Sequence, residues 1–425
     1  MQLPRALTFT QPLLCASIGL WALQLTSFAQ ESTPEPSDRN AFESLFDGRL
    51  PASIANGHLN LDIRARYERA EQDTKGTSNA PTVRTLLGYE TAPLYGFKLM
   101  VEFEDVRIIG SEDQFNQAGL SGAGKTVIAD VEGTELNQGW ISYERWDTLA
   151  RVGRQRINLD NQRFVGDVAW RQHDQTFDAA TIENKSLPHT VLSYSHLENV
   201  NRIFTDGSLQ GNFRSDSHLI HACFDGWSLG KVTGYAYLLD FDNSAANSSD
   251  TFGLSFVGKH VFDAKLPGSL AYRGEYAHQR DAADNPAKYS ADYYTLELGG
   301  EIQRFNAGAG YEVLGSDNGV GFSTPLATLH SFNGWADVFL ATPAAGLRDL
   351  YVWAGVKLPH QIPFKIVYHD FESDRGGLDF GSEWDAVLST KLGDHWSALL
   401  KYADYDSGST FLDTRRFWVQ HEFTY

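Results

Sequence analysis

The sequence predicts an all-β protein, a transmembrane antiparallel β-barrel of about 18 strands with long outer loops and short periplasmic turns. Three observations favour this fold. The chain ends in a strand with one apolar and one polar face, the same alternation recurs along the chain, and short connections alternate with long polar ones. A barrel wall produces this pattern because lipid wets one side of each strand and a watery lumen wets the other.

The last strand is predicted at residues 415–425. At a period of two, apolar side chains occupy one of its faces: Phe417, Val419, Phe423 and Tyr425. Outer-membrane barrels carry such aromatics in a girdle at the membrane interface. We therefore expect the outer membrane of a Gram-negative bacterium as the location, outer-membrane lipid as the surroundings, and the barrel assembly machinery as a partner that recognises this strand.

Earlier segments alternate in the same way. In residues 58–68, apolar side chains interleave with Asn60, Asp62, Arg64, Arg66 and Glu68. Further alternating segments are residues 97–104, 270–276, 304–313 and 364–369. A soluble β-sandwich also alternates, but it rarely sets so many charges opposite aromatics over such a length without a domain break.

The connections between these segments alternate in length. Short links are predicted at residues 92–96, 145–148, 185–188, 225–227, 358–361 and 393–394. Long polar links are predicted at residues 71–81, 108–134, 158–171, 200–215 and 372–383. An even strand number requires residues 315–348 to form one long outer loop. Within it, residues 329–340 have a helical period, so we predict a helix that folds into the lumen and narrows the pore.

The N-terminus predicts export. Residues 1–29 combine Arg5, an apolar stretch and the small-residue site Ser27-Phe28-Ala29, the layout of a cleaved signal peptide. Residues 30–58 then form a short N-terminal periplasmic segment, and residues 59–425 form the barrel. The short segment has no room for a plug domain, which argues against an energised receptor.

Composition excludes two other classes of protein. No run of 18 apolar residues follows the signal, so the sequence does not predict a membrane-spanning helix. The formal net charge of −19 argues against a nucleic-acid partner.

Two motifs suggest chemistry that their context contradicts. Residues 119–126, ending in Lys125 and Thr126, match the phosphate-binding pattern GxxxxGK[ST], but the pattern needs a buried strand before it and a helix after it. We interpret them as a polar loop and expect no nucleotide. His218 and His221 suggest zinc, but in a strand such a pair points to opposite faces. We expect no metal, no cofactor and no enzymatic activity, since the nucleophile pattern GxSxG is also missing from the sequence.

A resemblance to a known family covers nearly the whole chain after the signal. Its main segment is Val152-Gly-Arg-Gln-Arg-Ile-Asn-Leu-Asp-Asn-Gln-Arg-Phe-Val165, and others are residues 87–90, 99–106, 133–138, 175–180, 334–337, 347–351, 367–371 and 401–405. In this order they resemble the alginate-export-type outer-membrane porins. The resemblance implies a monomeric barrel with the strand number predicted above, and a channel for an anionic sugar polymer.

The candidate pore-lining and solute-binding residues are the basic side chains on predicted inward faces or around the 158–171 loop. They are Arg64, Arg66, Lys98, Arg154, Arg156, Arg163, Arg273, Arg304, Lys365 and Lys401. Arginine suits two-point contact with a carboxylate. Acids share the inward faces, so each basic residue is open to a second interpretation, an ion pair that stabilises the wall. A track that binds and releases anions needs such neighbours to keep binding weak.

Together these features predict a passive outer-membrane channel for an anionic polysaccharide such as alginate, or for smaller acidic solutes. The alternatives are a general unspecific porin and, with less support, a membrane-embedded barrel enzyme.

Overall fold

The computed structural model describes residues 49–262 and 267–425. The predicted signal peptide, residues 1–29, lies outside the described residues, as does the 30–48 part of the predicted N-terminal segment. The chain divides into two compact units, residues 1–51 and 52–425. The second unit carries every strand that is described here.

Eighteen of the strands in residues 49–262 and 267–425 belong to one antiparallel sheet, and two short ones form a separate hairpin. The sheet consists of β1 (His58–Gln72), β2 (Ser78–Glu90), β3 (Phe97–Ile108), β4 (Gly133–Arg145), β5 (Thr148–Gln155), β6 (Thr176–Asn184), β7 (Thr190–Asn201), β8 (Asn212–Trp227), β9 (Gly230–Leu239), β10 (Ser249–Val261), β11 (Gly268–Asp281), β12 (Ser290–Ile302), β13 (Phe305–Leu314), β16 (Leu347–Lys357), β17 (Pro363–Glu372), β18 (Asp379–Lys391), β19 (Trp396–Ser407) and β20 (Thr414–Thr424). The hairpin is β14 (Ser316–Asp317) with β15 (Val320–Gly321).

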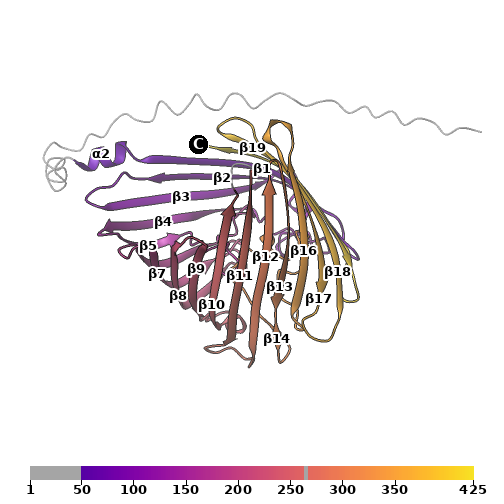
Figure 1. The fold of residues 1–425 in the computed structure, drawn as a ribbon. Helices are drawn as coiled ribbons and strands as arrows, with labels where there is room; N and C mark the ends of the chain where they lie inside the picture. The colour runs from indigo at the N-terminus through magenta and orange to yellow at the C-terminus, as the bar shows by residue number, and fades with distance from the viewer. Residues whose placement is uncertain (1–48, 263–266) are drawn as a thin grey trace, which may run out of the picture. The chain divides into compact units, whose positions relative to one another are not determined.

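Each of these eighteen strands pairs with the next one, and the last pairs with the first (Figure 1). The closing seam between β1 and β20 runs from the pair Asp62 and Thr424 to the pair Gln72 and Thr414. Closure removes the free edges that an open sheet would expose to lipid. The predicted fold class is confirmed.

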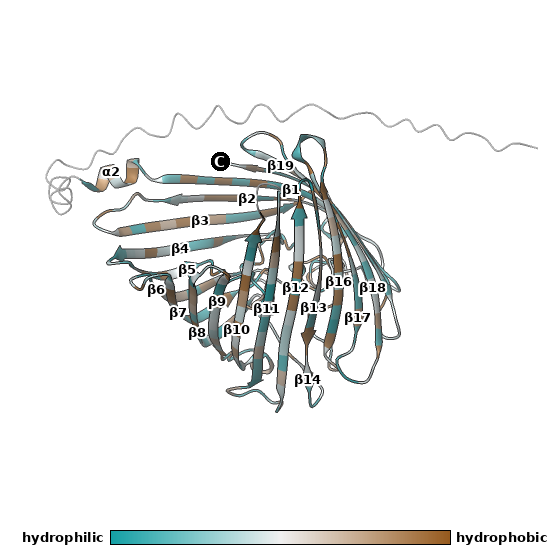
Figure 2. Ribbon diagram, in the orientation of Figure 1, coloured by the Kyte–Doolittle hydropathy of each residue, from teal (hydrophilic) through white to brown (hydrophobic). Residues whose placement is uncertain are grey.

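The two faces of the wall differ as expected. On β3, Phe97, Leu99, Val101 and Phe103 are about half exposed on the outer face, whereas Glu102 is fully buried on the inner face. Figure 2 shows hydrophobic and hydrophilic residues alternating along the strands. The inner-face residue Glu102 is therefore covered by protein, and the outer face is an apolar surface that suits lipid.

The C-terminal strand behaves as predicted. Phe417, Val419 and Tyr425 are exposed on the outer side, while Trp418 between them is fully buried. Tyr425 extends the seam beyond β20, because its N–H donates to the Leu61 carbonyl at 2.8 Å.

Some predicted connections shift at their ends. The predicted link at residues 225–227 lies inside β8, and the long link at residues 71–81 shortens to residues 73–77. In both places the strands stay paired beyond the predicted strand end, to the pair Trp227 and Gly230 and to the pair Ala70 and Ser78, so polarity alone does not mark where a strand ends. Residues 315–346 form one long connection between β13 and β16, as expected.

The helix predicted at residues 329–340 is wrong. Only the 3₁₀ turn η3 (Leu329–Ser331) forms there. Asn333 and Gly334 follow with φ of 54° and 83°, a left-handed conformation that ends a right-handed helix. At Gly334 a Cβ atom would clash with the Glu383 carboxylate, so the chain approaches the wall too closely for any other residue.

The remaining described helices are short: α2 (Arg49–Ala55), η1 (Glu112–Gln114), η2 (Ala245–Asn247) and η4 (Pro359–Gln361). None of the helices in residues 49–262 and 267–425 has the length and apolar character to cross a membrane. Residues 119–126 lie in the connection between β3 and β4, and Lys125 donates to the Asp113 carbonyl at 2.6 Å. This is the loop that the sequence predicted in place of a phosphate site.

Candidate functional site

Two long connections fill the interior of the barrel. We call residues 156–175 the first lumen loop and residues 315–346 the second lumen loop. They are bonded to each other: the Gly166 N–H donates to the Leu326 carbonyl at 2.9 Å, and the Thr328 N–H donates to the Gln162 carbonyl at 3.0 Å. Both belong to outer connections, because the short turns, the start of β1 and the end of β20 occupy the opposite, periplasmic end of the strands.

Aromatic contacts attach both loops to the wall. In the first lumen loop, Phe164 lies 5.2 Å from the ring of Tyr235 and 5.3 Å from the ring of Tyr293. In the second, Phe339 lies 4.5 Å from the ring of Phe371. These residues form one buried hydrophobic cluster, so the barrel has a core inside its lumen. Such a core holds the loops in one position.

Arg163 joins the two loops and the wall. Its Nε donates to Glu312 on β13 at 2.8 Å, and its terminal nitrogens donate to Thr324 at 3.2 Å and Asn333 at 3.1 Å. The side chain is buried, yet its pKa stays above the usual value: burial lowers it, and the charge of Glu312 outweighs that effect. Arg163 is therefore a buried structural cation, with its donors used inside the protein.

A second buried network lies against β1, β19 and β20. Arg171 of the first lumen loop donates to Glu68 at 2.9 Å and forms an ion pair with Asp337 of the second. Arg416 donates to the other oxygen of Glu68 at 2.6 Å. The Glu68 carboxylate on the wall thus bonds two arginines. One of them, Arg171, belongs to the first lumen loop and also bonds the second.

Lys401 on β19 lies in a cage of tryptophans within this network. Its Nζ lies 3.9 Å from the ring centroid of Trp335 and 4.1 Å from that of Trp170, and it donates to His330 Nε2 at 2.6 Å. His330 in turn donates from Nδ1 to Asp337 at 2.7 Å. Burial lowers the pKa of His330 to about 3, so the ring is neutral and accepts the bond from Lys401.

Most predicted site residues lie inside the barrel, and many of them are paired. Arg64 bonds Glu422 at 2.7 Å, and Arg66 donates to Gln420 at 2.6 Å while its guanidinium lies 4.4 Å from the Trp170 ring centroid. Arg156 bonds Glu102 at 2.9 Å and also Asp174. For these residues the ion-pair interpretation describes the geometry.

Three further predicted residues lie nearer the periplasmic end. Lys98 bonds Glu90 at 2.7 Å, and Arg273 pairs with Glu275. Lys365 has no ion pair with a described residue, and its Nζ lies 5.4 Å from the Trp353 ring centroid. Lys365 is thus a free cation of the wall.

Two predicted residues do not face the lumen. Arg154 shares a strand face with Val152, which is 57% exposed on the outer surface, and it pairs there with Asp178 at 2.8 Å. Arg304 is exposed in the two-residue turn between β12 and β13, stacked on Phe305. Alternation does not predict the orientation of either residue. Arg154 is a candidate only because it lies near the predicted 158–171 loop, and Arg304 precedes the first residue of β13 by one position.

The sequence interpretation missed several lumen residues. Arg84 bonds Asp62 at 2.7 Å and lies 3.7 Å from Asp174, and Asp130 lies 3.7 Å from Arg66. Alternation in β2 would have found Arg84. No local signal marks Asp130 or Asp174, because they reach the lumen through loops. The two histidines of the rejected zinc pattern lie apart: His221 bonds Asp160 of the first lumen loop at 2.8 Å, and His218 lies on the outer face beside Tyr194.

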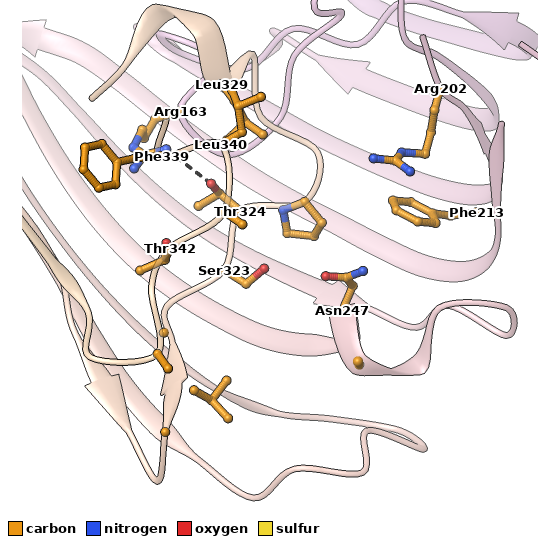
Figure 3. A pocket seen from close by; sticks show the side chains of 17 residues that line it. Arg163, Arg202, Phe213, Asn247, Ser323, Thr324, Leu329, Phe339, Leu340 and Thr342 are labelled. Atoms are coloured by element: carbon orange, nitrogen blue, oxygen red, sulfur yellow. Dashed lines mark hydrogen bonds between the residues drawn. The ribbon is translucent and has the colours of Figure 1, made fainter. Parts of the chain in front are cut away.

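Two cavities open above the lumen loops, on the side of the long connections. The first has a volume of 450 Å³ and is bordered by Arg163, Arg202 and Phe213 (Figure 3). The second has a volume of 390 Å³ and shares Arg202 with the first. Together their walls contain five basic side chains and one acidic side chain: Lys75, Arg163, Arg171, Arg202, Arg416 and Asp337. We call these two cavities the outer mouth.

A smaller cavity of 180 Å³ lies on the other side of the second lumen loop, which borders it with Phe332 and Trp335. We call it the inner chamber. Its charged lining is mixed: Arg273, Lys365, Glu297, Glu312 and Asp349. The lumen loops therefore separate a basic region from a mixed one.

Comparisons with known proteins agree with this architecture. The alginate export family model matches residues 57–190, which confirms the predicted resemblance over that part of the chain. No curated protein matches the chain. Among solved structures, OccD3 (OpdP) of Pseudomonas aeruginosa has a TM-score of 0.65 at 13% identity and covers 88% of this chain and 92% of its own.

Two other structures extend the comparison. OccAB2 of Acinetobacter baumannii has a TM-score of 0.69 at 13% identity, over 88% of this chain and 99% of its own. OpdK of Pseudomonas aeruginosa, solved with vanillate, has a TM-score of 0.66 at 13% identity, over 88% of this chain and all of its own. These are outer-membrane porin folds. The chain therefore has a porin-type β-barrel fold.

Proposed function

We propose that this barrel is a passive diffusion channel for small acidic solutes. The observation that carries the proposal is the outer mouth, where five basic side chains and one acidic side chain border the two cavities. The whole chain is acidic, with a formal net charge of −19. A solute in the lumen responds mainly to charges within roughly 8–10 Å, a range that includes the carboxylates paired with Arg163, Arg171 and Arg416. Lys75 and Arg202 have no ion pair with a described residue, so these two cations supply the local excess of positive charge.

Size favours a small solute over a sugar polymer. The cavities of the outer mouth measure 450 and 390 Å³, in the range of sites for single small molecules. The two lumen loops are bonded together across the interior, and a polymer would have to separate them. Alginate is thus the second candidate, and it requires the loops to move.

The inner chamber supports release. A channel needs sites that attract a solute without holding it. The chamber sets Lys365 and Arg273 among three acids, so a carboxylate that reaches it meets repulsion as well as attraction. We propose no catalytic step along this path and no bound cofactor.

The remaining predictions belong to the same proposal. Residues 1–29 are cleaved as a signal peptide, residues 30–58 form a short periplasmic segment and residues 59–425 form the barrel. The barrel is a monomer in outer-membrane lipid and is inserted by the barrel assembly machinery, which its aromatic C-terminal strand engages.

Planar-bilayer recordings of the purified barrel under a KCl gradient test the proposal. We expect the sign of the reversal potential to show that the channel prefers anions. The Arg202→Gln variant should show a smaller anion preference. Liposome swelling then compares benzoate, a neutral sugar of similar size and an alginate oligomer. Equal rates for benzoate and the neutral sugar would support the rival function, an unspecific porin. Entry of the oligomer at the rate of benzoate would favour the polymer.

A further inference from the structure

Arg202 differs from the other arginines that border the outer mouth. Arg163, Arg171 and Arg416 each form an ion pair with a buried carboxylate. Arg202 forms no ion pair with any residue in the described ranges 49–262 and 267–425, and the only hydrogen bond of its side chain within them is from Nη1 to the Gln210 carbonyl at 3.1 Å. A guanidinium has five N–H donors, so most of them are free to bind a solute.

Two aromatic rings hold the Arg202 side chain in place. Its Cζ lies 4.3 Å from the ring centroid of Phe213 and 4.8 Å from that of Phe204. Burial lowers the pKa of Arg202 to about 10, with no carboxylate contributing, so the group remains charged at neutral pH. The cation is therefore fixed, partly desolvated and without a counter-ion among the residues that the structure describes. This combination strengthens a bond to an incoming anion.

The cavity beside Arg202 has two kinds of wall. Figure 3 shows Arg202 and Phe213 on one side and Thr324 and Leu340 across the space. Thr324 accepts a hydrogen bond from Arg163, which leaves its hydroxyl proton free to donate. The other labelled lining residues are Asn247, Ser323, Leu329, Phe339 and Thr342. An apolar patch next to one cation and a few polar groups suits a small acid with an apolar body.

We propose that Arg202 binds the carboxylate of a small, flat, apolar acid at the outer mouth, with the ring of Phe213 against the body of the solute. The guanidinium donates two parallel N–H bonds to the two carboxylate oxygens. This inference rests on the proposed channel function and adds an entry site to it, on the outer side of the lumen loops. A uronate polymer fits this site less well, because each of its rings is surrounded by hydroxyl groups.

Binding of sodium benzoate to the purified, folded full-length barrel in detergent tests the site without any need for transport. We expect saturable binding to the unmodified protein. Arg202→Gln should weaken it about tenfold or more, because a hydrogen-bonded charge pair is lost. Arg202→Lys should restore part of the affinity, since it keeps the charge and loses the two-point geometry. Phe213→Leu should weaken benzoate binding several-fold more than it weakens acetate binding, because acetate has no ring to pack against Phe213.

The matched control is Arg214→Gln. Arg214 is exposed on β8 one residue beyond Phe213 and forms no ion pair with a described residue, so its loss should leave benzoate binding unchanged. Benzyl alcohol, which has the ring without the charge, should not compete. Equal affinity of Arg202→Gln and the unmodified protein, with both folded by heat-modifiable mobility, would overturn the site. A barrel that binds benzoate at Arg202 but does not conduct would keep the site and overturn the channel.

Discussion

The outer mouth and the inner chamber lie on the two sides of the same lumen loops, and they differ in charge and size. Five basic side chains and one acidic one border the outer mouth, whereas two basic and three acidic ones border the inner chamber. The cavities of the outer mouth have more than twice the volume of the chamber. An anion therefore meets attraction first and mixed charges later.

This difference arises from where the buried acids lie. Glu68 and Glu312 neutralise arginines from the wall side of the outer mouth, so the cavity meets the cationic side of each pair. In the inner chamber, Glu297 and Asp349 themselves border the space. The number of inward charges is thus a poor guide to selectivity. Which partner of each pair faces the cavity determines the local field.

The largest effect should come from removing the barrier between the two regions. Replacing residues 316–345 by a short Gly-Ser linker is possible because Leu314 and Leu347 are paired neighbours. We expect single-channel conductance to rise several-fold, since a barrel of this strand number without its loops leaves an open aqueous channel. The control replaces residues 283–286, in the connection between β11 and β12, and should conduct like the unmodified protein. An unchanged conductance in the loop variant would mean that ions pass elsewhere.

A second experiment weakens the same barrier without deleting it. Arg163→Gln leaves Glu312 buried without its cation, which typically costs about 3–5 kcal/mol. We expect the second lumen loop to become sensitive to external protease and the urea midpoint to fall. Arg280→Gln is the control. Arg280 pairs with Asp250, its side chain is 60% exposed, and such surface pairs contribute about 0–1 kcal/mol to stability. Equal losses in the two variants would argue against the buried role of Arg163.

The sequence predicted the barrel well because its wall has a local signature. Alternation along β1, β3 and β19 depends only on neighbouring residues, so it predicts the inward positions of Arg64, Arg66 and Lys401. The loops have no such period. Arg163 is a candidate pore-lining residue by its place near the 158–171 loop, but nothing in its neighbours indicates that it donates to Glu312, 149 residues away.

The features that separate the outer mouth from the inner chamber were least visible in the sequence. Arg202 stands out only because no acidic side chain in the described part of the chain pairs with it, which is a property of the folded loops. The predicted helix at residues 329–340 failed for a related reason. The apolar residues Phe332, Ala336 and Phe339 meet the wall at a helical spacing, but an extended loop with a left-handed turn at Gly334 produces the same contacts.

A third experiment sharpens the comparison through pH. Burial lowers the pKa of His330 to about 3, below the ordinary value of about 6.5 for an exposed histidine. His330 thus binds a proton more readily in a released loop than in the packed one. The packed loop has its full stability above about pH 6.5 and loses stability as the pH falls below that value. Between pH 7 and pH 5 the loss is about 2 kcal/mol. We expect protease access to the second lumen loop to increase on acidification.

His173 of the first lumen loop opposes this trend, which makes a matched variant necessary. Burial lowers its pKa, but the hydrogen bond and charge of Glu104 outweigh burial and raise it, so its contribution is lost as the pH rises. The measurement is therefore the difference between the unmodified protein and His330→Gln. If both show the same pH dependence, His330 does not control the loop.

The smallest expected effect concerns β5. The register of this strand determines whether Arg154 or Arg156 faces the lumen. Arg154 faces outward beside Val152, whereas Arg156, two residues later, turns into the lumen and bonds Glu102 at 2.9 Å. Its side chain is 27% exposed, so it still contributes to the field that a passing ion meets. Arg156→Gln should shift the reversal potential by a few millivolts toward cations. Arg154→Gln should not, because Arg154 lies on the outer surface of the wall and is already paired there with Asp178. Equal shifts from the two variants would mean that both arginines face the pore and that the strand is rotated by one residue.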